Sequence, residues 1–231
     1  MERQRKEEAA ETIAAVEKAE AVSVHEGLQL LFGTGNSTNA SNTTRGTVAE
    51  ASVPTPTGTI VKMAAVSLKT LDAAGGVATV PSPEAGAALT VSSQNLRHAT
   101  EMAEHAGLTA EGPIVMTIMA LSEEASSKLA RDNVLAARRL ASSLKSKAIS
   151  ISFWTSDGVR IPLSGLDPPL TIVVQVDDPN ATCAFWDEEA AKWSNDGVTT
   201  LQGHEPNTIT CNTTHLSVFG GVVVDVLLKL C

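Results

Sequence analysis

The chain of 231 residues contains no tyrosine, and aromatic residues make up only 3% of the sequence. Positive charge is also scarce, because 17 lysines and arginines face 26 aspartates and glutamates, for a formal net charge of −9. Nucleic-acid binding depends on a basic surface that neutralises phosphates. The composition therefore argues against nucleic acid as a main partner.

Long apolar runs are missing as well. No stretch reaches the roughly 18 apolar residues of a membrane-spanning helix, and residues 222–230 are interrupted by Asp225 and Lys229. The N-terminus begins Met-Glu-Arg-Gln-Arg-Lys-Glu-Glu and has no apolar core behind it, unlike a secretory signal peptide. If the protein works outside the cell, we expect this chain to be a part of a longer membrane protein.

Cysteines number three, so one pair can form and one cysteine is left over. Five of the nine asparagines lie in Asn-x-Ser/Thr sequons, which favours a secreted or lumenal chain. A threonine-rich loop that produces sequons by chance is the alternative. We predict glycans at Asn36, Asn39, Asn42 and Asn180, but not at Asn212, which lies beside a cysteine.

Three segments are predicted along the chain. Residues 1–32 are rich in Ala, Glu, Lys and Gln and contain no proline, which predicts a helix with a solvated N-terminal part. This helix either packs on the domain or forms a short coiled-coil stalk. Residues 33–58 contain Gly-Thr-Gly, three sequons and two prolines, which predict a flexible linker. Residues 59–231 are predicted to form a mainly β domain.

The hydrophobic pattern divides the first part of that domain into strands and helices. Residues 59–71 and 76–93 are predicted as β segments, and residues 94–105 as a short helix. Residues 113–121 are apolar enough for a buried strand, and residues 122–147 are predicted as one helix.

The second part is predicted to be mostly β. Residues 148–154 alternate apolar side chains with Ser150 and Ser152, which predicts a strand with one face in solvent. Residues 156–158 are predicted to form a hairpin turn, and residues 170–176 a strand that is apolar on both faces. The fold class is therefore α+β, with an N-terminal helical segment before a mainly antiparallel β-sandwich.

The most informative stretch is a series of Cys, Trp, Gly, His, Ser and Phe residues near the C-terminus. Its members are Cys183, Trp186, Trp193, Gly197, Cys211, His215, Leu216, Ser217 and Phe219. Their order and spacing resemble the GPS motif, the self-cleaving end of the GAIN domain of adhesion G-protein-coupled receptors and polycystin-1-like proteins. The resemblance places the motif at residues 183–224. It implies a GAIN-like sandwich on the extracellular face of a longer membrane protein.

The resemblance also implies a disulfide between Cys183 and Cys211, whose loop closure contributes roughly 3 kcal/mol. The family pattern usually has two further cysteines, and this chain carries Val198 and Thr213 in their places. Both members of one disulfide are thus missing together. With one disulfide and Phe219 after the site, the motif is more similar to the polycystin-1 type than to the receptor type.

The residues at the implied cleavage site suggest how the chain could cut itself. The Ser217 hydroxyl can attack the Leu216 carbonyl through a five-membered ring, which is nucleophilic catalysis in cis. His215 is the only base within two residues of Ser217 in the sequence, and its neutral imidazole suits that role near pH 7. The attack gives an ester that water hydrolyses. The fold has to supply strain in the turn and a donor for the oxyanion.

Two other interpretations compete with self-cleavage. In the first, the stretch is an ordinary turn before a last strand, in an uncleaved module that couples an ectodomain to the membrane. In the second, the chain is a free-standing soluble protein with a stray motif. We expect no cofactor and no metal site, because the acidic residues and histidines lack the spacing of metal ligands.

The remaining motif residues are predicted to be structural. We expect Trp186 and Trp193 to pack in the core around the disulfide. After cleavage, the strand at residues 218–224 should stay in the sandwich as a noncovalent partner of the rest. Further implied partners are the adjoining transmembrane region of the parent protein and an unidentified extracellular ligand.

Overall fold

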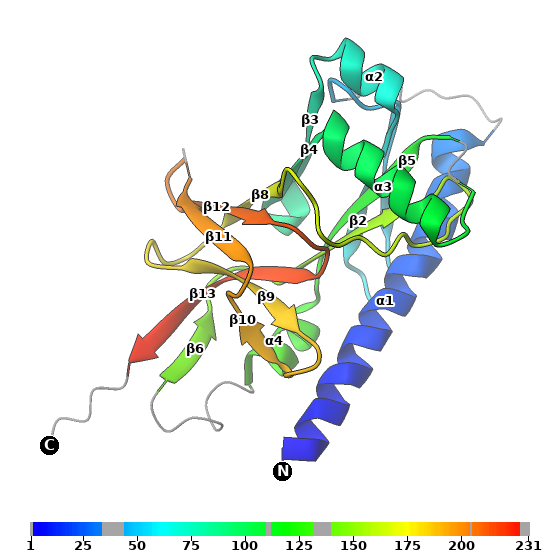
Figure 1. Ribbon diagram of the computed structural model, residues 1–231. Helices are drawn as coiled ribbons and strands as arrows, with labels where there is room; N and C mark the ends of the chain where they lie inside the picture. The colour runs from blue at the N-terminus through cyan, green and yellow to red at the C-terminus, as the bar shows by residue number, and fades with distance from the viewer. Residues whose placement is uncertain (1, 34–43, 110–111, 132–139, 204, 227–231) are drawn as a thin grey trace, which may run out of the picture.

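Two antiparallel sheets and a long N-terminal helix make up the computed structural model, which describes residues 2–33, 44–109, 112–131, 140–203 and 205–226 (Figure 1). The larger sheet has eight strands and the smaller sheet has five. Every strand pair is antiparallel within this described part. The predicted α+β class, with a helical segment before an antiparallel sandwich, is confirmed.

The larger sheet has the order β1-β2-β5-β7-β13-β9-β10, and β6 also pairs with β13. Its strands are β1 (Ala49–Pro54), β2 (Ile60–Val66), β5 (Ile114–Ala120), β6 (Leu140–Leu144), β7 (Ile149–Trp154), β9 (Thr182–Asp187), β10 (Lys192–Ser194) and β13 (Val218–Val226).

The smaller sheet has the order β11-β12-β8-β4-β3. Its strands are β3 (Val77–Ser82), β4 (Ala87–Ser92), β8 (Leu170–Gln175), β11 (Val198–Gln202) and β12 (Thr208–Thr213). The helices are α1 (Glu2–Phe32), α2 (Leu68–Ala73), the short 3-10 helix η2 (Pro83–Ala85), α3 (Ser93–His105) and α4 (Glu123–Arg131).

The main core lies between the two sheets. The larger sheet contributes Ile151 and Phe153 from β7, and the smaller sheet contributes Leu89 and Ile172. All four side chains are at most 1% exposed. Burying each of them stabilises the fold by about 2–3 kcal/mol, so this inner layer is the main hydrophobic contact between the sheets.

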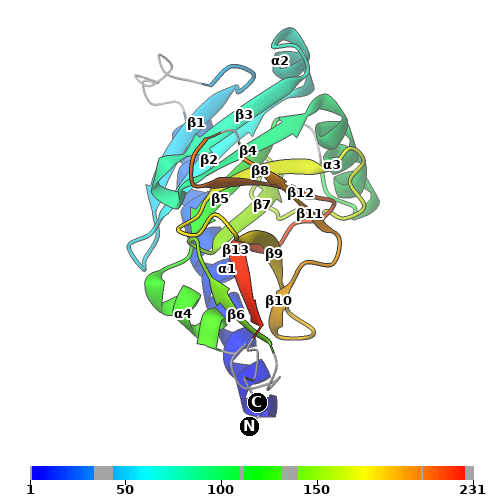
Figure 2. The same cartoon turned by 90° about the vertical axis from the view of Figure 1, so that its left-hand side faces the viewer.

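Helix α1 covers the outer face of the larger sheet (Figures 1 and 2). Val24 packs with Val53 of β1 and Met63 of β2 in a second buried cluster. Gly27 lies so close to the sheet that a Cβ atom there would overlap the Met63 side chain. Residues 2–32 therefore belong to the sandwich as a packed cover and do not form a separate stalk.

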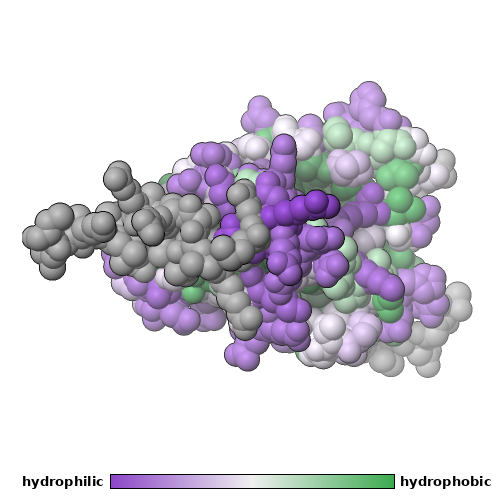
Figure 3. Space-filling model, turned by 90° about the horizontal axis from the view of Figure 1, so that it is seen from below, coloured by the Kyte–Doolittle hydropathy of each residue, from purple (hydrophilic) through white to green (hydrophobic). Residues whose placement is uncertain are grey.

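The first turns of α1 are largely solvated, as predicted. Glu7, Glu8 and Glu11 are exposed, while Ala9 and Ile13 are buried. Viewed from below, hydrophilic residues dominate the face around the N-terminal end of the helix (Figure 3). The helix thus buries one narrow apolar stripe and leaves its other side in water.

The predicted linker at residues 33–58 is wrong in part. Residues 49–54 form β1, which pairs with all but the last residue of β2 and lies at the edge of the larger sheet. Pro54 is compatible with this strand because an edge strand tolerates a residue without an N–H. The β segment predicted over residues 59–71 is also too long, since α2 begins at Leu68 and is capped by Ser67.

The single helix predicted for residues 122–147 is wrong as well. Helix α4 ends at Arg131, and β6 pairs Leu144 with Val222 of β13. Residues 132–139 lie outside the described residues. Residues 140–147 have ordinary helix formers, so the strand owes its formation to pairing with β13 and not to local propensity.

Two predictions about strand faces need correction. Strand β7 is buried on both faces, although Ser150 and Ser152 had predicted a solvated face, because α1 covers these serines. Strand β8 shows the opposite case. It alternates between buried and more exposed residues, with Thr171 and Gln175 on the less buried face.

Candidate functional site

The turn at residues 214–217 joins β12 to β13 and so connects the smaller sheet to the larger one. The segment that precedes β8 holds the turn from one side. The Leu166 N–H donates to the Thr214 carbonyl at 2.9 Å, and the Leu216 N–H donates to the Leu163 carbonyl at 3.3 Å. The implied cleavage site is therefore a turn fixed by backbone hydrogen bonds.

A disulfide joins Cys183 and Cys211, as the resemblance implied, and so links the strand before this turn to β9, the neighbour of the strand after it. Cys183 lies on β9 of the larger sheet and Cys211 on β12 of the smaller one, with 5.6 Å between their Cα atoms. Both cysteines are fully buried in the main core. The disulfide thus joins the two sheets four residues before His215.

The places of the missing cysteines lie next to each other. Val198 and Thr213 are paired residues of β11 and β12. Thr213 is fully buried, and its hydroxyl contacts the His215 backbone, accepting from the N–H at 3.3 Å and donating to the carbonyl at 3.0 Å. Sequence reasoning noted Thr213 only as a lost cysteine. Its position two residues before His215 is a signal for such a local hydroxyl–backbone turn.

His215 is half-buried between two phenylalanines. Its ring centroid lies 4.5 Å from that of Phe185, edge to face, and 5.9 Å from that of Phe219. Burial lowers the pKa of the imidazole from its ordinary value of 6.5, because desolvation disfavours the charged form. The side chain is therefore neutral at pH 7.

The contacts of the His215 ring indicate which nitrogen carries the proton. Nδ1 lies 3.4 Å from the Thr213 hydroxyl oxygen, whose own hydrogen is directed to the His215 carbonyl. With the hydroxyl hydrogen on the carbonyl, Nδ1 is the donor in this contact and Nε2 keeps its lone pair. Nε2 is buried and has no hydrogen-bond partner among the described residues. A neutral imidazole with a free lone pair is the form that a general base requires.

Ser217 is held in a different direction from the one that cleavage requires. Its hydroxyl donates to the Trp186 carbonyl on β9 at 3.1 Å, and its own carbonyl accepts from the Ile151 N–H of β7 at 3.4 Å. In the described part of the chain no hydrogen bond joins Ser217 to His215. The structure therefore brings both residues into one turn without forming the base–nucleophile contact.

The predicted strain of the turn is not visible in its backbone. Among the described non-glycine residues, a positive φ occurs at Ala191 and Asn207, and neither lies in residues 214–217. Gly197 has a φ of +80° in the turn between β10 and β11, where a side chain would be strained. Within the motif, the positive φ therefore lies at Gly197 and not at Leu216 or Ser217.

Trp186 and Trp193 are buried core residues, but they do not pack around the disulfide. Their rings lie 5.6 Å apart in an edge-to-face pair. They belong to an outer cluster with Ile13 of α1 and Val218 of β13. Because neighbouring residues of β9 point to opposite faces, Trp186 faces α1 while Cys183 faces the inner core. Phe219 is fully buried in that inner core.

The other predicted sites have simpler outcomes. Asn180 is exposed and within hydrogen-bond distance of Asp178, whereas Asn36, Asn39 and Asn42 lie outside the described residues. No group of three His, Cys, Asp or Glu side chains that could hold a metal ion occurs in the described residues. No helix among them is long and apolar enough to cross a membrane.

Comparison with known protein families gives a match that covers most of the chain. No curated protein matches the chain at a significant level. A family model described as GPS, GAIN subdomain B, matches residues 37–224. This range covers most of the chain and contains both sheets, the disulfide and the turn at His215, while α1 lies before it. The chain therefore belongs to the family of GAIN subdomain B, which carries the GPS motif.

Proposed function

We propose that this domain cleaves its own backbone between Leu216 and Ser217. In the first step, Nε2 of His215 takes the hydroxyl proton of Ser217 and Oγ attacks the Leu216 carbonyl carbon. The C–N bond then breaks, the nitrogen of Ser217 receives the proton from His215, and an ester links Leu216 to Oγ. Water hydrolyses this ester, which releases the Leu216 carboxylate and restores the Ser217 hydroxyl.

The unpartnered Nε2 of His215 supports this function most directly. A buried imidazole nitrogen normally has a partner, because an unsatisfied polar atom costs about 1–3 kcal/mol. Here Thr213 contacts Nδ1 and two phenylalanine rings pack against the imidazole, while Nε2 has no hydrogen-bond partner among the described residues. A general base requires such a nitrogen, which can accept a proton.

One rearrangement is needed before the chemistry can start. The Ser217 hydroxyl has to leave the Trp186 carbonyl and turn toward His215. Rotation about one side-chain bond changes the direction of a serine hydroxyl. Catalytic hydrogen bonds often form only in the reacting complex, so the contact with Trp186 is compatible with the reaction.

After cleavage, β13 is the partner of the remaining domain. It pairs with β6, β7 and β9, and its Phe219 is fully buried in the main core. Many ladder hydrogen bonds and this buried ring would hold the new fragment without a covalent bond. The bond can therefore break while the sandwich stays assembled.

Family membership supports a proposal about the larger protein to which the domain belongs. We propose that it forms an extracellular part of a larger membrane protein of the polycystin-like or adhesion-receptor-like kind. The exposed sequon asparagine Asn180 is compatible with a glycan on that side of the membrane. The adjoining transmembrane region and an extracellular ligand would then be its partners.

An uncleaved coupling module is the second candidate function. The hydrogen bond from the Ser217 hydroxyl to the Trp186 carbonyl favours it, because that bond ties the turn to β9 and occupies the nucleophile. In this case the domain would transmit force or position between an ectodomain and the membrane without breaking its chain.

The two functions differ in the fate of one peptide bond. On a denaturing gel, the wild-type chain should give a short C-terminal fragment whose first residue is Ser217. Ser217→Ala should stay intact, and Ser217→Thr should cleave because it keeps the hydroxyl. An intact wild-type chain that is natively folded would favour the coupling module.

A further inference from the structure

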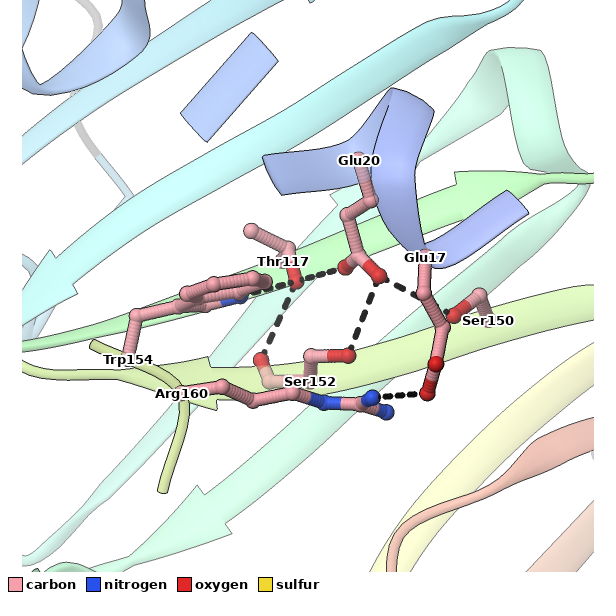
Figure 4. A network of polar contacts seen from close by, with 7 residues as sticks. All are labelled: Glu17, Glu20, Thr117, Ser150, Ser152, Trp154 and Arg160. Atoms are coloured by element: carbon pink, nitrogen blue, oxygen red, sulfur yellow. Dashed lines mark hydrogen bonds and ion pairs between the residues drawn. The ribbon is translucent and has the colours of Figure 1, made fainter. Parts of the chain in front are cut away.

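A buried carboxylate joins α1 to the centre of the larger sheet (Figure 4). Glu20 is fully buried, although it is charged in water. Its carboxyl accepts hydrogen bonds from Thr117 of β5 at 2.5 Å and from Ser152 and Ser150 of β7 at 3.2 and 3.4 Å. Glu20 thus explains why two serines of a central strand are buried without contact with water.

A tryptophan extends this network along the sheet. The indole N–H of Trp154 donates to the Thr117 hydroxyl at 3.1 Å. The Thr117 hydroxyl also lies 3.1 Å from the Ser152 carbonyl, which is an alternative acceptor for its hydrogen. Each of these polar groups has a partner inside the cluster, so the loss of the Glu20 carboxyl would leave buried donors unsatisfied.

Strand β7, which contacts Glu20, also contacts the implied cleavage site. Ser150 of β7 is paired with Val218 of β13, and the Ile151 N–H donates to the Ser217 carbonyl. The residues that contact Glu20 therefore flank the one that binds Ser217. Strand β7 thus connects the Glu20 network to the site, in addition to the packing of Ile13 against Trp186 and Val218. Helix α1 lies outside the residues that the family model matches.

Few charged groups face Glu20. Arg160, which follows β7, and Glu17 of α1 form an ion pair with each other at the edge of the network. Strand β2 presents Met63 beside Thr117, and β5 and β7 present hydroxyl groups. Burial raises the pKa of Glu20, against the smaller lowering effects of its hydrogen bonds and of Arg160.

We propose that Glu20 is a positioning residue for the Leu216–Ser217 bond: by fixing β7 from its outer face, its carboxyl holds the Ser217 backbone where His215 can act. This role rests on the proposed self-cleavage, and it assigns to α1 a part in the regulation of that site. Loosening of the contact between α1 and the sheet would move β7 and slow the reaction without a change at His215 or Ser217.

The carboxyl also gives this contact a pH dependence. Since the pKa of Glu20 is raised in the folded protein above 4.5, protonation favours docking of α1. The contribution is fully present below about pH 4.5 and is lost as the pH rises through the raised pKa. Burial lowers the pKa of His215 from 6.5, so the titration of His215 has to be separated from that of Glu20 in any test.

The test is amide hydrogen exchange at Ile151 in the full chain, on a Ser217→Ala background that keeps every variant uncleaved. Protection factors, which correct for the intrinsic pH dependence of exchange, are compared between about pH 5 and pH 8. Glu20→Gln is a neutral variant of nearly the same shape, and Glu17→Gln is the matched control on the same helix. All three chains keep His215, so a dependence that persists in Glu20→Gln does not come from Glu20.

We expect the protection factor of the Ile151 amide to rise by roughly threefold or more toward low pH in the Ser217→Ala chain and in its Glu17→Gln variant. The rise should be clearly smaller in the Glu20→Gln variant. Equal pH dependence in all three chains overturns the proposal. With Ser217 restored, the folded fraction of Glu20→Ala should be less cleaved than wild type, and Glu20→Gln should recover cleavage at neutral pH. Wild-type cleavage in folded Glu20→Ala also overturns it.

The outcomes separate the two proposals. If the wild-type chain is never cleaved, the proposed function fails, while the exchange measurement still decides whether Glu20 positions the Ser217 segment. If Glu20→Ala does not fold, the comparison of the glutamine variants gives the answer.

Discussion

Val198 lies directly opposite Thr213 on neighbouring strands, at the two places where the family pattern usually has a disulfide. In this chain the two residues are paired across the strands without a covalent bond, and Thr213 makes a contact of its own. The Thr213 hydroxyl binds the backbone of His215, which a cysteine in a disulfide could not do. Hydrogen bonds of the Thr213 hydroxyl, instead of a second disulfide, therefore hold the end of β12 before the cleavage site.

Restoring the missing link is the first prediction. Val198→Cys combined with Thr213→Cys should form a disulfide, because the two residues are direct neighbours on paired strands. Closing a loop of about 15 residues contributes about 3 kcal/mol, and the lost Thr213 hydrogen bonds cost about 1 kcal/mol. A rise of about 4–8 °C in Tm follows for a domain of this size. Intact mass and thermal unfolding check it, with each single variant as control; an oxidised double variant no more stable than wild type would contradict it.

The second prediction concerns the hydroxyl of Thr213 alone. Thr213→Val keeps the shape but removes the partner of the His215 N–H and carbonyl, which should destabilise the domain by about 1 kcal/mol. The cleaved fraction should fall, since the imidazole is no longer held. Thr213→Ser should restore both properties. Valine and serine variants that are cleaved to the same extent would show that the hydroxyl has no role in placing His215.

The third prediction is a pH dependence. Because burial lowers the pKa of His215 in the folded state below 6.5, its contribution to stability is present above pH 6.5. That contribution is lost as the pH falls through the lowered pKa. Cleavage should persist at pH 6.5 and decline below it, since only the neutral ring is a base. An NMR titration of the imidazole in Ser217→Ala measures the pKa, and a value at or above 6.5 would be the contrary result.

The fourth prediction tests the contact of α1 with the motif. Ile13 is 4% exposed and packs in the cluster of Trp186 and Trp193. Ile13→Ala should cost about 2–5 kcal/mol and shift the tryptophan fluorescence to longer wavelength. Leu30→Ala on the same helix is the control, because Leu30 is 69% exposed. Equal Tm values for the two variants would mean that α1 is not a structural part of the domain.

Much of the fold could be predicted from the sequence where local signals and tertiary contacts agree. The bounds of α1 follow from a run of helix formers that ends before Gly33. Strand β5 is apolar except for Thr117 and is buried on both faces. The resemblance to the GPS motif also implied the pair Cys183 and Cys211, which the structure joins.

The failures occur where distant contacts override the local pattern. Ser150 and Ser152 suggest a solvated face. Both serines are buried because they contact Glu20, which lies 130 residues before Ser150 in the sequence. Strand β6 forms through its pairing with β13, which no local pattern in residues 140–144 reveals. At the site itself, sequence could name His215 and Ser217, but it could not show that the Ser217 hydroxyl points to the Trp186 carbonyl.

The mass of the purified, folded chain under denaturing conditions tests self-cleavage most directly. We predict two species, one that ends at Leu216 and contains the Cys183–Cys211 disulfide, and a short one that begins at Ser217. Under native conditions the two should run as a single particle, because β13 stays paired in the larger sheet. A single mass of the uncut chain from natively folded protein would contradict the account.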